Sequence, residues 1–235
     1  MAFMTLRVAT FNIRHGLGID KRLDLDRTAS VVRTTGAGLI ALQEVDRGLP
    51  RSNRVDQAAA LGDATGMHAT FAPTLRRAGG EYGIALLTDV PVEATVEPLP
   101  RVEREEPRVV VVCSWHGVTI VATHLAQRGE ARAAHTTALA RRAAALGAGG
   151  APVVVLGDLN QGPRTLGGLR AAGFAGGPRR ATFSRRRAID HILAGPGVRL
   201  EKTWMIRSDA SDHLPLVGDL IIDGPQPRPA RDSGF

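Results

Sequence analysis

The strongest constraint on the fold is the segment Ala151 to Pro163, APVVVLGDLNQGP, in which an apolar run stops abruptly on a carboxylate. Val153 to Gly157 are apolar or small residues that follow a proline, a pattern typical of a short buried strand. If the backbone stays extended beyond it, Asp158 and Asn160 project to the same side. The segment therefore predicts a buried strand that presents an acid and an amide at one point, and an ordinary turn beginning at Asp158 is the alternative.

The same pattern recurs at the ends of other predicted strands. Strands are predicted at 6–12, 39–43, 118–123, 153–157, 189–194 and 214–222. In layered folds, functional groups gather where strand ends and their loops converge on one rim. The polar residues at or beside these strand ends are Asn12, Glu44, His124, Asp158, Asn160, Asp190, Asp212 and His213. This recurrence predicts a single polar site rather than a scattered set of caps.

The remaining segments predict a mixed α/β domain. Helices are predicted at 25–35, 55–65, 130–146 and 165–172, the first of them capped by Asp24. Further strands are predicted at 68–71, 82–87, 109–115 and 200–206, and the pair His116-Gly117 predicts a tight hairpin between 109–115 and 118–123. No Pro/Gly/Ser-rich linker divides the chain, so we expect one domain over 1–222 and a flexible tail over 223–235, which contains three prolines.

Composition limits the compartment and the partners. A single cysteine, Cys113, excludes an intramolecular disulfide. The N-terminus lacks the features of a signal peptide and no apolar run has the length of a membrane span, so we expect a cytoplasmic protein without integral membrane association. The net charge is +7, and Arg54 with the run Arg185, Arg186 and Arg187 are candidate substrate-binding residues, the alternative being a solvated charged face.

Several motifs together identify a family resemblance. TFNIRHG, ALQEVD, EYGIALLTDVPV, VATHL, VVLGDLNQGP, AIDHIL and SDHLPLVGDL occur in this order along nearly the whole chain. In this respect the chain resembles the endonuclease/exonuclease/phosphatase superfamily, and GDLN with a C-terminal SDHLP is a highly specific combination. The resemblance implies a four-layer α/β sandwich of two mixed β-sheets flanked by helices. It also implies divalent-metal-dependent hydrolysis of phosphate esters.

The implied metal is Mg²⁺ or Mn²⁺. A hard cation polarises a phosphoryl group and neutralises the leaving oxygen, and Mg²⁺ prefers oxygen ligands and keeps several waters. The resemblance assigns Glu44 as the main metal ligand, with Asp212 and Asn12 completing the shell. The sequence contains no Cys/His cluster of zinc type.

The resemblance also assigns the acid and base groups. Asp158 would orient and deprotonate the attacking water, and Asn160 would hold a phosphoryl oxygen. Asp190 and His213 would pair, which fixes the tautomer of the imidazole and favours its protonated form. His124 would be a second donor, or an acid, near the leaving group.

Three points leave alternatives open. His191 could replace His213 as the paired imidazole, but alternation along the strand directs it away from Asp190. Many relatives carry Asn after the glycine of EYGIALL where this chain has Ile84, so one polar contact with the substrate is expected to be missing. Glu81 either supports His124 or is an exposed loop acid.

Substrate identity is not encoded in the shared site, because folds host many functions. The first hypothesis is a phosphoesterase that acts on a small or lipid-derived phosphate ester. The runner-up is a nuclease, which the arginines would favour by attracting a polyanion, although aromatic residues for base stacking are few. A non-catalytic binding module on the same fold is a third hypothesis, and the full set of acid and base residues argues against it.

Overall fold

The computed structural model describes residues 3–127, 129–184 and 186–223. In these ranges four α-helices are present, α1 (Leu25–Thr35), α2 (Gln57–Thr65), α3 (Gly129–Leu146) and α4 (Gly167–Ala171). The strands are β1 (Phe3–Asn12), β2 (Leu39–Arg47), β3 (His68–Arg77), β4 (Gly80–Thr88), β5 (Ala94–Pro98), β6 (Val109–Trp115), β7 (Val118–His124), β8 (Val153–Asp158), β9 (Ala175–Gly176), β10 (Asp190–Ala194), β11 (Val198–Met205) and β12 (Leu216–Asp223).

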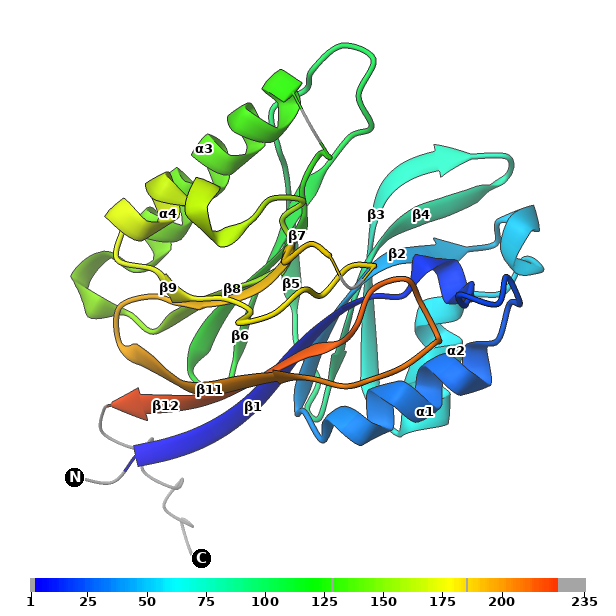
Figure 1. The fold of residues 1–235 in the computed structure, drawn as a ribbon, viewed down its shortest axis with the longest axis horizontal. Helices are drawn as coiled ribbons and strands as arrows, with labels where there is room; N and C mark the ends of the chain where they lie inside the picture. The colour runs from blue at the N-terminus through cyan, green and yellow to red at the C-terminus, as the bar shows by residue number, and fades with distance from the viewer. Residues whose placement is uncertain (1–2, 128, 185, 224–235) are drawn as a thin grey trace, which may run out of the picture.

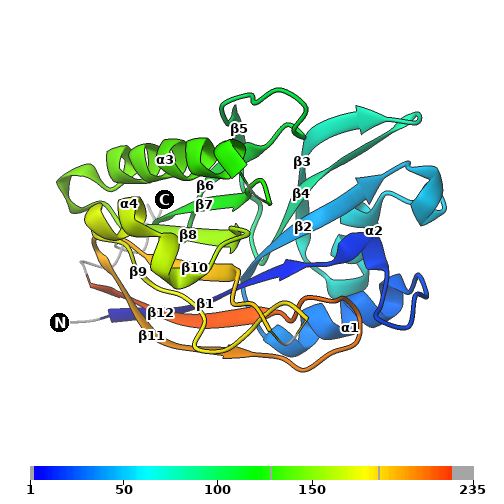
Figure 2. The same ribbon diagram turned by 45° about the horizontal axis from the view of Figure 1, so that its top comes forward.

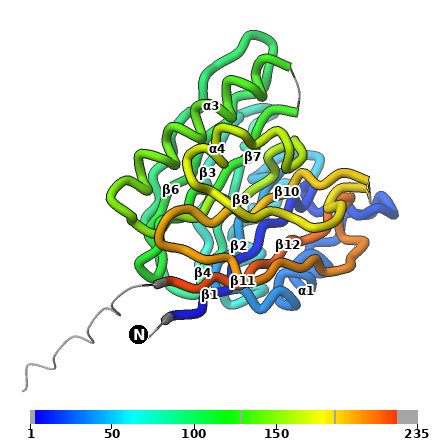
Figure 3. Tube along the Cα trace, turned by 60° about the vertical axis from the view of Figure 1, so that its left-hand side comes forward, coloured from blue at the N-terminus to red at the C-terminus, as the bar shows by residue number. Residues whose placement is uncertain are grey.

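The strands form two six-stranded mixed sheets that lie face to face (Figure 1). Their orders are β11-β12-β1-β2-β4-β3 and β5-β6-β7-β8-β10-β9. Helices α1 and α2 cover the outer face of the first sheet, and α3 and α4 cover that of the second (Figures 2 and 3). The four-layer sandwich expected from the sequence is therefore confirmed.

Three apolar layers of side chains hold the two sheets and their covering helices together. The central layer lies between the sheets and includes Val154, Leu156 and Ile192. The other two layers pack each sheet against its helices; for example, Val153 and Val155 contact the α3 side. Because successive side chains of a strand point to opposite faces, Asp158 continues the row of Val154 and Leu156 into the space between the sheets.

The polar site follows from how these inward rows end. In each sheet the central pair of strands is parallel, β1 with β2 and β7 with β8. Parallel strands end at the same edge, so Asn12 pairs in register with Gln43, and His124 with Asp158. Strand β10 runs antiparallel to β8 and begins at that edge, with Asp190 opposite Asp158. The apolar interior between the sheets therefore ends in polar side chains at one rim.

A β-bulge modifies this alternation at Glu44. Register shifts between Leu42 and Val45 where β2 pairs with β4, and Glu44 has a left-handed φ of 58°. The extra residue breaks the simple inward–outward pattern and lets Glu44 contact Asn12 although Gln43 also faces the rim. A bulge next to a functional residue is a common way of re-aiming its side chain.

Most predicted elements are present, with some differences at their ends. The His116-Gly117 hairpin is confirmed, with φ of 46° and 77° at the two turn residues. Strands β5 and β9 are additional to those that the sequence predicts. The sequence assigns Asp223 to the predicted tail, whereas the structure places it at the end of β12; the remaining tail residues, 224–235, lie outside the described ranges. No helix in the described part of the chain is both long and apolar enough to cross a membrane.

Candidate active site

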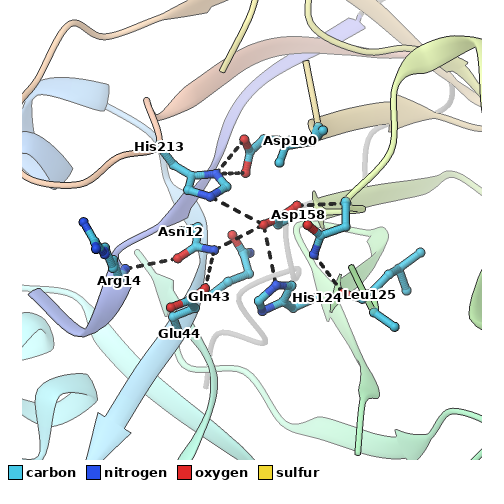
Figure 4. A network of polar contacts seen from close by, with 12 residues as sticks. Asn12, Arg14, Gln43, Glu44, His124, Leu125, Asp158, Asp190 and His213 are labelled. Atoms are coloured by element: carbon cyan, nitrogen blue, oxygen red, sulfur yellow. Dashed lines mark hydrogen bonds and ion pairs between the residues drawn. The ribbon is translucent and has the colours of Figure 1, made fainter. Parts of the chain in front are cut away.

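The site is centred on the carboxylate of Asp158, the last residue of β8. Its side chain is buried, with 1% of the residue exposed. Atom Oδ1 accepts a hydrogen bond from the Asn160 backbone N–H at 2.9 Å, so a turn does begin here. Atom Oδ2 faces the space between the sheets, where it accepts the Asn12 side-chain N–H at 3.2 Å (Figure 4). One oxygen therefore shapes the local backbone while the other is presented to the site.

Two imidazoles point the same ring atom at that oxygen. The Nε2 atoms of His124 and His213 lie 3.5 Å and 3.7 Å from Asp158 Oδ2 (Figure 4). Both histidines are buried, as is the carboxylate between them. Burial, together with the nearby charge of Asp190, raises the pKa of Asp158 above its ordinary value. A carboxylate with a raised pKa beside two imidazoles is suited to accept a proton near neutral pH.

The residues beyond the two imidazoles differ in charge. The Nδ1 atom of His213 donates to both oxygens of Asp190, at 2.9 and 3.1 Å. Burial alone would lower the pKa of His213, but the charge of Asp190 and the hydrogen bond to it outweigh burial and raise this pKa. The Nδ1 atom of His124 instead lies 3.0 Å from the guanidinium of Arg108. Burial lowers the pKa of His124, and the charge of Arg108 lowers it further.

The loop that carries His213 is held against both sheets. The hydroxyl of Ser211 donates to the Asn12 carbonyl at 2.8 Å and accepts the His213 backbone N–H at 3.2 Å. On the other side, the ring of Phe183 packs on the His213 imidazole with centroids 4.6 Å apart. The hydroxyl of Thr182 accepts the backbone N–H of Asp190 at 3.2 Å. These contacts explain why segments far apart in sequence meet at a defined geometry.

Asn12 connects Asp158 to the more open side of the site. Its Nδ2 donates to Glu44 Oε1 at 3.0 Å as well as to Asp158, and its Oδ1 accepts the Arg14 backbone N–H at 3.1 Å. The guanidinium of Arg14 lies 3.7 Å from Asp212. Glu44 and Asp212 are partly exposed, whereas Asp158 is buried. The two partly exposed carboxylates therefore lie on the accessible side of the cluster.

Asn160 differs from the extended geometry that the sequence predicted. Its φ of 53° is left-handed, so the strand does not continue through it. The side chain donates from Nδ2 to the carbonyl of Leu125 at 2.9 Å and is buried. Asp158 and Asn160 are therefore linked through the turn hydrogen bond rather than by a shared strand face. The amide of Asn160 still has a second N–H and an oxygen that could contact a substrate.

Of the four arginines predicted to bind the substrate, three lie in the described part of the chain, and all three are exposed. Arg186 and Arg187 are exposed on the loop that begins with Phe183, and Arg185 lies outside the described residues. Arg54 is also exposed, on the loop after β2. A groove of about 790 Å³ is lined by residues that include Arg179, Arg180, Arg207, Trp204 and Leu214, and not by Arg54, Arg186 or Arg187. The groove adjoins the polar cluster around Asp158, since Leu214 follows His213, but is not lined by Asp158, His124 or His213.

The open alternatives are decided by these contacts. Glu81 of β4 pairs with Arg47 and Arg76, so the partner of His124 is Arg108 and not Glu81. Ile84 is buried in the apolar layer between the sheets and offers no polar contact. The Nε2 of His191 donates to the backbone carbonyl of Gln161 at 2.8 Å, so this imidazole does not take the place of His213 beside Asp190.

Sequence reasoning did not identify Arg108, Ser211, Thr182 or Phe183 as part of the site. For Arg108 a signal was available, because the predicted hairpin register places the start of β6 opposite the end of β7, where His124 lies. The other three act through loop contacts that no local pattern encodes.

One group in the described chain brings together three side chains that could hold a metal ion. Asp158, Asp190 and His213 offer ligand atoms that lie within 4.8 Å of one another. As observed, however, His213 is ion-paired to Asp190, and an imidazole must be neutral to bind a metal. Glu44 forms no ion pair with any described residue, which leaves its carboxylate better suited to a cation.

The described chain is thus a four-layer α/β sandwich whose rim carries a buried carboxylate between two imidazoles. The chain belongs to the endonuclease/exonuclease/phosphatase family, whose model matches residues 9–213. Members of this family hydrolyse phosphate esters and typically use a divalent metal. No curated protein is significantly similar to the chain in sequence.

Solved structures agree on the fold. An endonuclease/exonuclease/phosphatase from Beutenbergia cavernae is 22% identical with a TM-score of 0.75, and the match covers 96% of this chain and 73% of that one. A mannosyl-6-phosphatase from Bacteroides thetaiotaomicron is 17% identical with a TM-score of 0.71, covering 92% and 99%. The catalytic domain of human Nocturnin, with bound sulfate, is 20% identical with a TM-score of 0.70, covering 93% and 96%.

Proposed function

We propose that the protein is a divalent-metal-dependent phosphoesterase that hydrolyses a phosphodiester or phosphomonoester of a small or lipid-derived substrate. The observation that carries this proposal is the convergence of Asn12, His124 and His213 on one oxygen of Asp158. An acceptor for the proton of water and donors for phosphoryl oxygens are the groups that this hydrolysis needs. The neighbouring mannosyl-6-phosphatase and the sulfate bound in Nocturnin support a tetrahedral oxyanion as the ligand.

The metal would be Mg²⁺ or Mn²⁺, held by Glu44 with Asp212 and Asn12. Glu44 lacks a cationic partner among the described residues, and its carboxylate is partly exposed, so this donor set suits a hard cation that keeps several waters. When bound, the metal supplies Lewis-acid polarisation of the phosphoryl group. The side-chain Nδ2–H of Asn12 fixes the orientation of Glu44. The Oδ1 atom of Asn12 already accepts the backbone N–H of Arg14.

The chain's own residues perform the proton chemistry. Asp158 orients a water and accepts its proton, since its raised pKa makes it a stronger base than an exposed carboxylate. His213, kept protonated by Asp190, donates from Nε2 to a phosphoryl oxygen on which charge develops. Asn160 holds a second phosphoryl oxygen through its remaining N–H. Arg54, Arg186 and Arg187 bind the substrate's outer anionic groups.

The test is a metal-supplemented panel of a chromogenic diester, inositol phosphates, sugar phosphates, phospholipids, plasmid DNA and RNA, each assayed with wild type and Asp158→Asn. Asp158→Asn keeps the size of the side chain and removes the base, so turnover should fall by on the order of 10²-fold or more. Asp63→Asn is the matched control, because Asp63 is an exposed helix residue far from β8 in sequence. Equal rates in wild type and Asp158→Asn would contradict the assignment.

A nuclease is the second candidate, and the groove beside the site favours it. Arg179, Arg180 and Arg207 line this groove, and their positive charge would attract a polyanion. Against it, Trp204 in the groove is already contacted by Arg7 and Lys202 at 5.0 and 5.3 Å from its ring centroid, which limits base stacking. Absence of cleavage of plasmid or RNA with Mg²⁺ or Mn²⁺ at low salt would dismiss this candidate. Binding of a phosphate ester without turnover of any substrate would instead favour the binding module.

A further inference from the structure

Arg108 is a buried arginine that contacts the site from behind His124. Only 7% of the residue is exposed. Its Nη1 lies 3.0 Å from His124 Nδ1, and its Nη2 donates to Glu106 at 3.1 Å. Burial of a guanidinium is costly unless it is paired, so its contacts with this carboxylate and this imidazole hold it in place.

This contact determines the tautomer of His124. A guanidinium has only N–H donors and stays protonated in proteins, so the atom facing it must accept. His124 Nδ1 therefore carries no proton, and in the neutral ring the proton lies on Nε2. That Nε2 is the atom 3.5 Å from Asp158 Oδ2.

The two histidines thus differ although they point the same atom at Asp158. His213 Nδ1 faces the acceptor Asp190, whereas His124 Nδ1 faces a donor. The charged groups around the His124 ring are Arg108, Asp158 and His213. Burial, the positive charge of Arg108 and that of His213 all oppose a second proton on the His124 ring.

We propose that Arg108 is a positioning residue that fixes His124 as a neutral hydrogen-bond donor, with the proton of its ring on Nε2. The proposal rests on the proposed phosphoesterase function. His124 then binds a phosphoryl oxygen through Nε2–H and does not serve as the general acid. The proton of the attacking water goes to Asp158, and the leaving oxygen is protonated from His213 or from solvent.

The direct test is nitrogen-15 NMR of histidine-labelled, metal-free protein, in which long-range correlations report the protonation of each ring nitrogen. The signals of His124 are assigned with a His124→Gln variant. Between pH 6 and 8, His124 should be protonated at Nε2 alone. A proton on His124 Nδ1 in this range would overturn the proposal.

Variants of Arg108 test the consequence for turnover. Arg108→Met removes the donor, so His124 should gain an ionisation on the acidic side of the pH profile. The value of kcat/KM should fall by on the order of 10–100-fold, the range found for groups that orient metal-ligating residues. Arg108→Lys retains a donor and should preserve the Nε2 tautomer. Arg101→Met, at an exposed position in the same loop, is the matched control.

The possible outcomes separate this proposal from the proposed function. A wild-type pH profile and wild-type His124 signals in Arg108→Met would overturn the role of Arg108. If Arg108→Met does not fold, then loss of the Nε2 tautomer in Arg108→Lys would also overturn it. If the wild type hydrolyses no phosphate ester, the proposed function fails, while the NMR experiment still decides the tautomer.

Discussion

The ion pair between Asp190 and His213 gives a stability that depends on pH in a predictable direction. Asp190→Asn removes the carboxylate and keeps the size of the side chain. In the folded protein the pKa of His213 is raised to about 9, because the charge of Asp190 and its hydrogen bond outweigh burial, against 6.5 in an unperturbed histidine. Since both residues are buried, solvent screens their interaction little.

The sign and the size follow from linkage. A group whose pKa is raised on folding stabilises the fold fully below its unfolded pKa, here 6.5, and this stabilisation is lost as the pH rises through about 9. Each pH unit between the two pKa values corresponds to about 1.4 kcal/mol, so the free energy at stake is roughly 3 kcal/mol. The charges of Asp158 and Asp212 also raise this pKa and are kept in the variant, so Asp190→Asn should be destabilised by up to about 3 kcal/mol at pH 6. Its difference from wild type should shrink toward zero by pH 10.

The assay is urea unfolding followed by tryptophan fluorescence in the presence of a chelator, at pH values from 4 to 10. Asp219→Asn is the control, because Asp219 is also a buried carboxylate but its partners are Arg7 at 2.7 Å and Lys202 at 3.2 Å. Hydrogen bonds from Arg7 lower the pKa of Asp219 below its ordinary 3.8. The contribution of Asp219 to the free energy of unfolding should thus be constant from pH 6 to 9 and be lost as the pH falls through the acid range. A destabilisation by Asp190→Asn that does not change between pH 6 and 10 would refute a protonated His213.

Three further predictions address backbone packing, the metal and the substrate. A Cβ at Gly157, where φ is 148°, would lie 1.9 Å from the Thr123 carbonyl oxygen, so Gly157→Ala should lower the free energy of unfolding by about 3 kcal/mol or more, measured by urea denaturation. Gly162→Ala, with open space around it, is its control, and equal stability of the two variants would contradict the close approach of β7 and β8. Glu44→Gln should weaken Mn²⁺ binding, measured by calorimetry, by at least the 10–100-fold typical of changes around a metal site. Unchanged affinity would show that Glu44 is not a metal ligand. If the substrate is nucleic acid, Arg186→Glu with Arg187→Glu should reduce the slope of log affinity against log salt by about 0.9 for each phosphate that the arginines no longer neutralise. A slope like that of wild type would exclude binding of phosphates by these two arginines.

The residues that could be predicted to converge are those at the ends of inward-facing rows. In β8 the apolar residues Val154 and Leu156 are followed by Asp158, and in β7 the alternation leads to His124. Such rows can be recognised in the sequence because the side-chain period of a strand is fixed and few polar groups are buried in a protein interior. The family motifs added the order of the elements and the two-sheet architecture, which periodicity alone does not specify.

The parts that could not be predicted depend on contacts between distant segments. Strand β9 is only Ala175–Gly176, and its conformation arises from pairing with β10 rather than from its own composition. The left-handed conformation of Glu44 depends on the bulge against β4, and that of Asn160 on the turn in which Asp158 accepts its backbone N–H. Neither could be deduced from alternation along a single strand.

The different partners of the two histidines show where local pattern ceases to be informative. His124 and His213 each point Nε2 at Asp158, so position alone would assign them the same role. Their protonation is determined by the partner of each Nδ1 atom. Asp190 accepts a hydrogen bond from His213, whereas Arg108 donates one to His124. Asp190 is a strand-end acid and could be selected from the sequence. Arg108 lies before an apolar strand in a region rich in exposed charge, so only the hairpin register with His124 distinguishes it from its neighbours. Assigning acid and donor roles in this site therefore requires the hydrogen-bond partners of the candidate residues as well as the residues themselves.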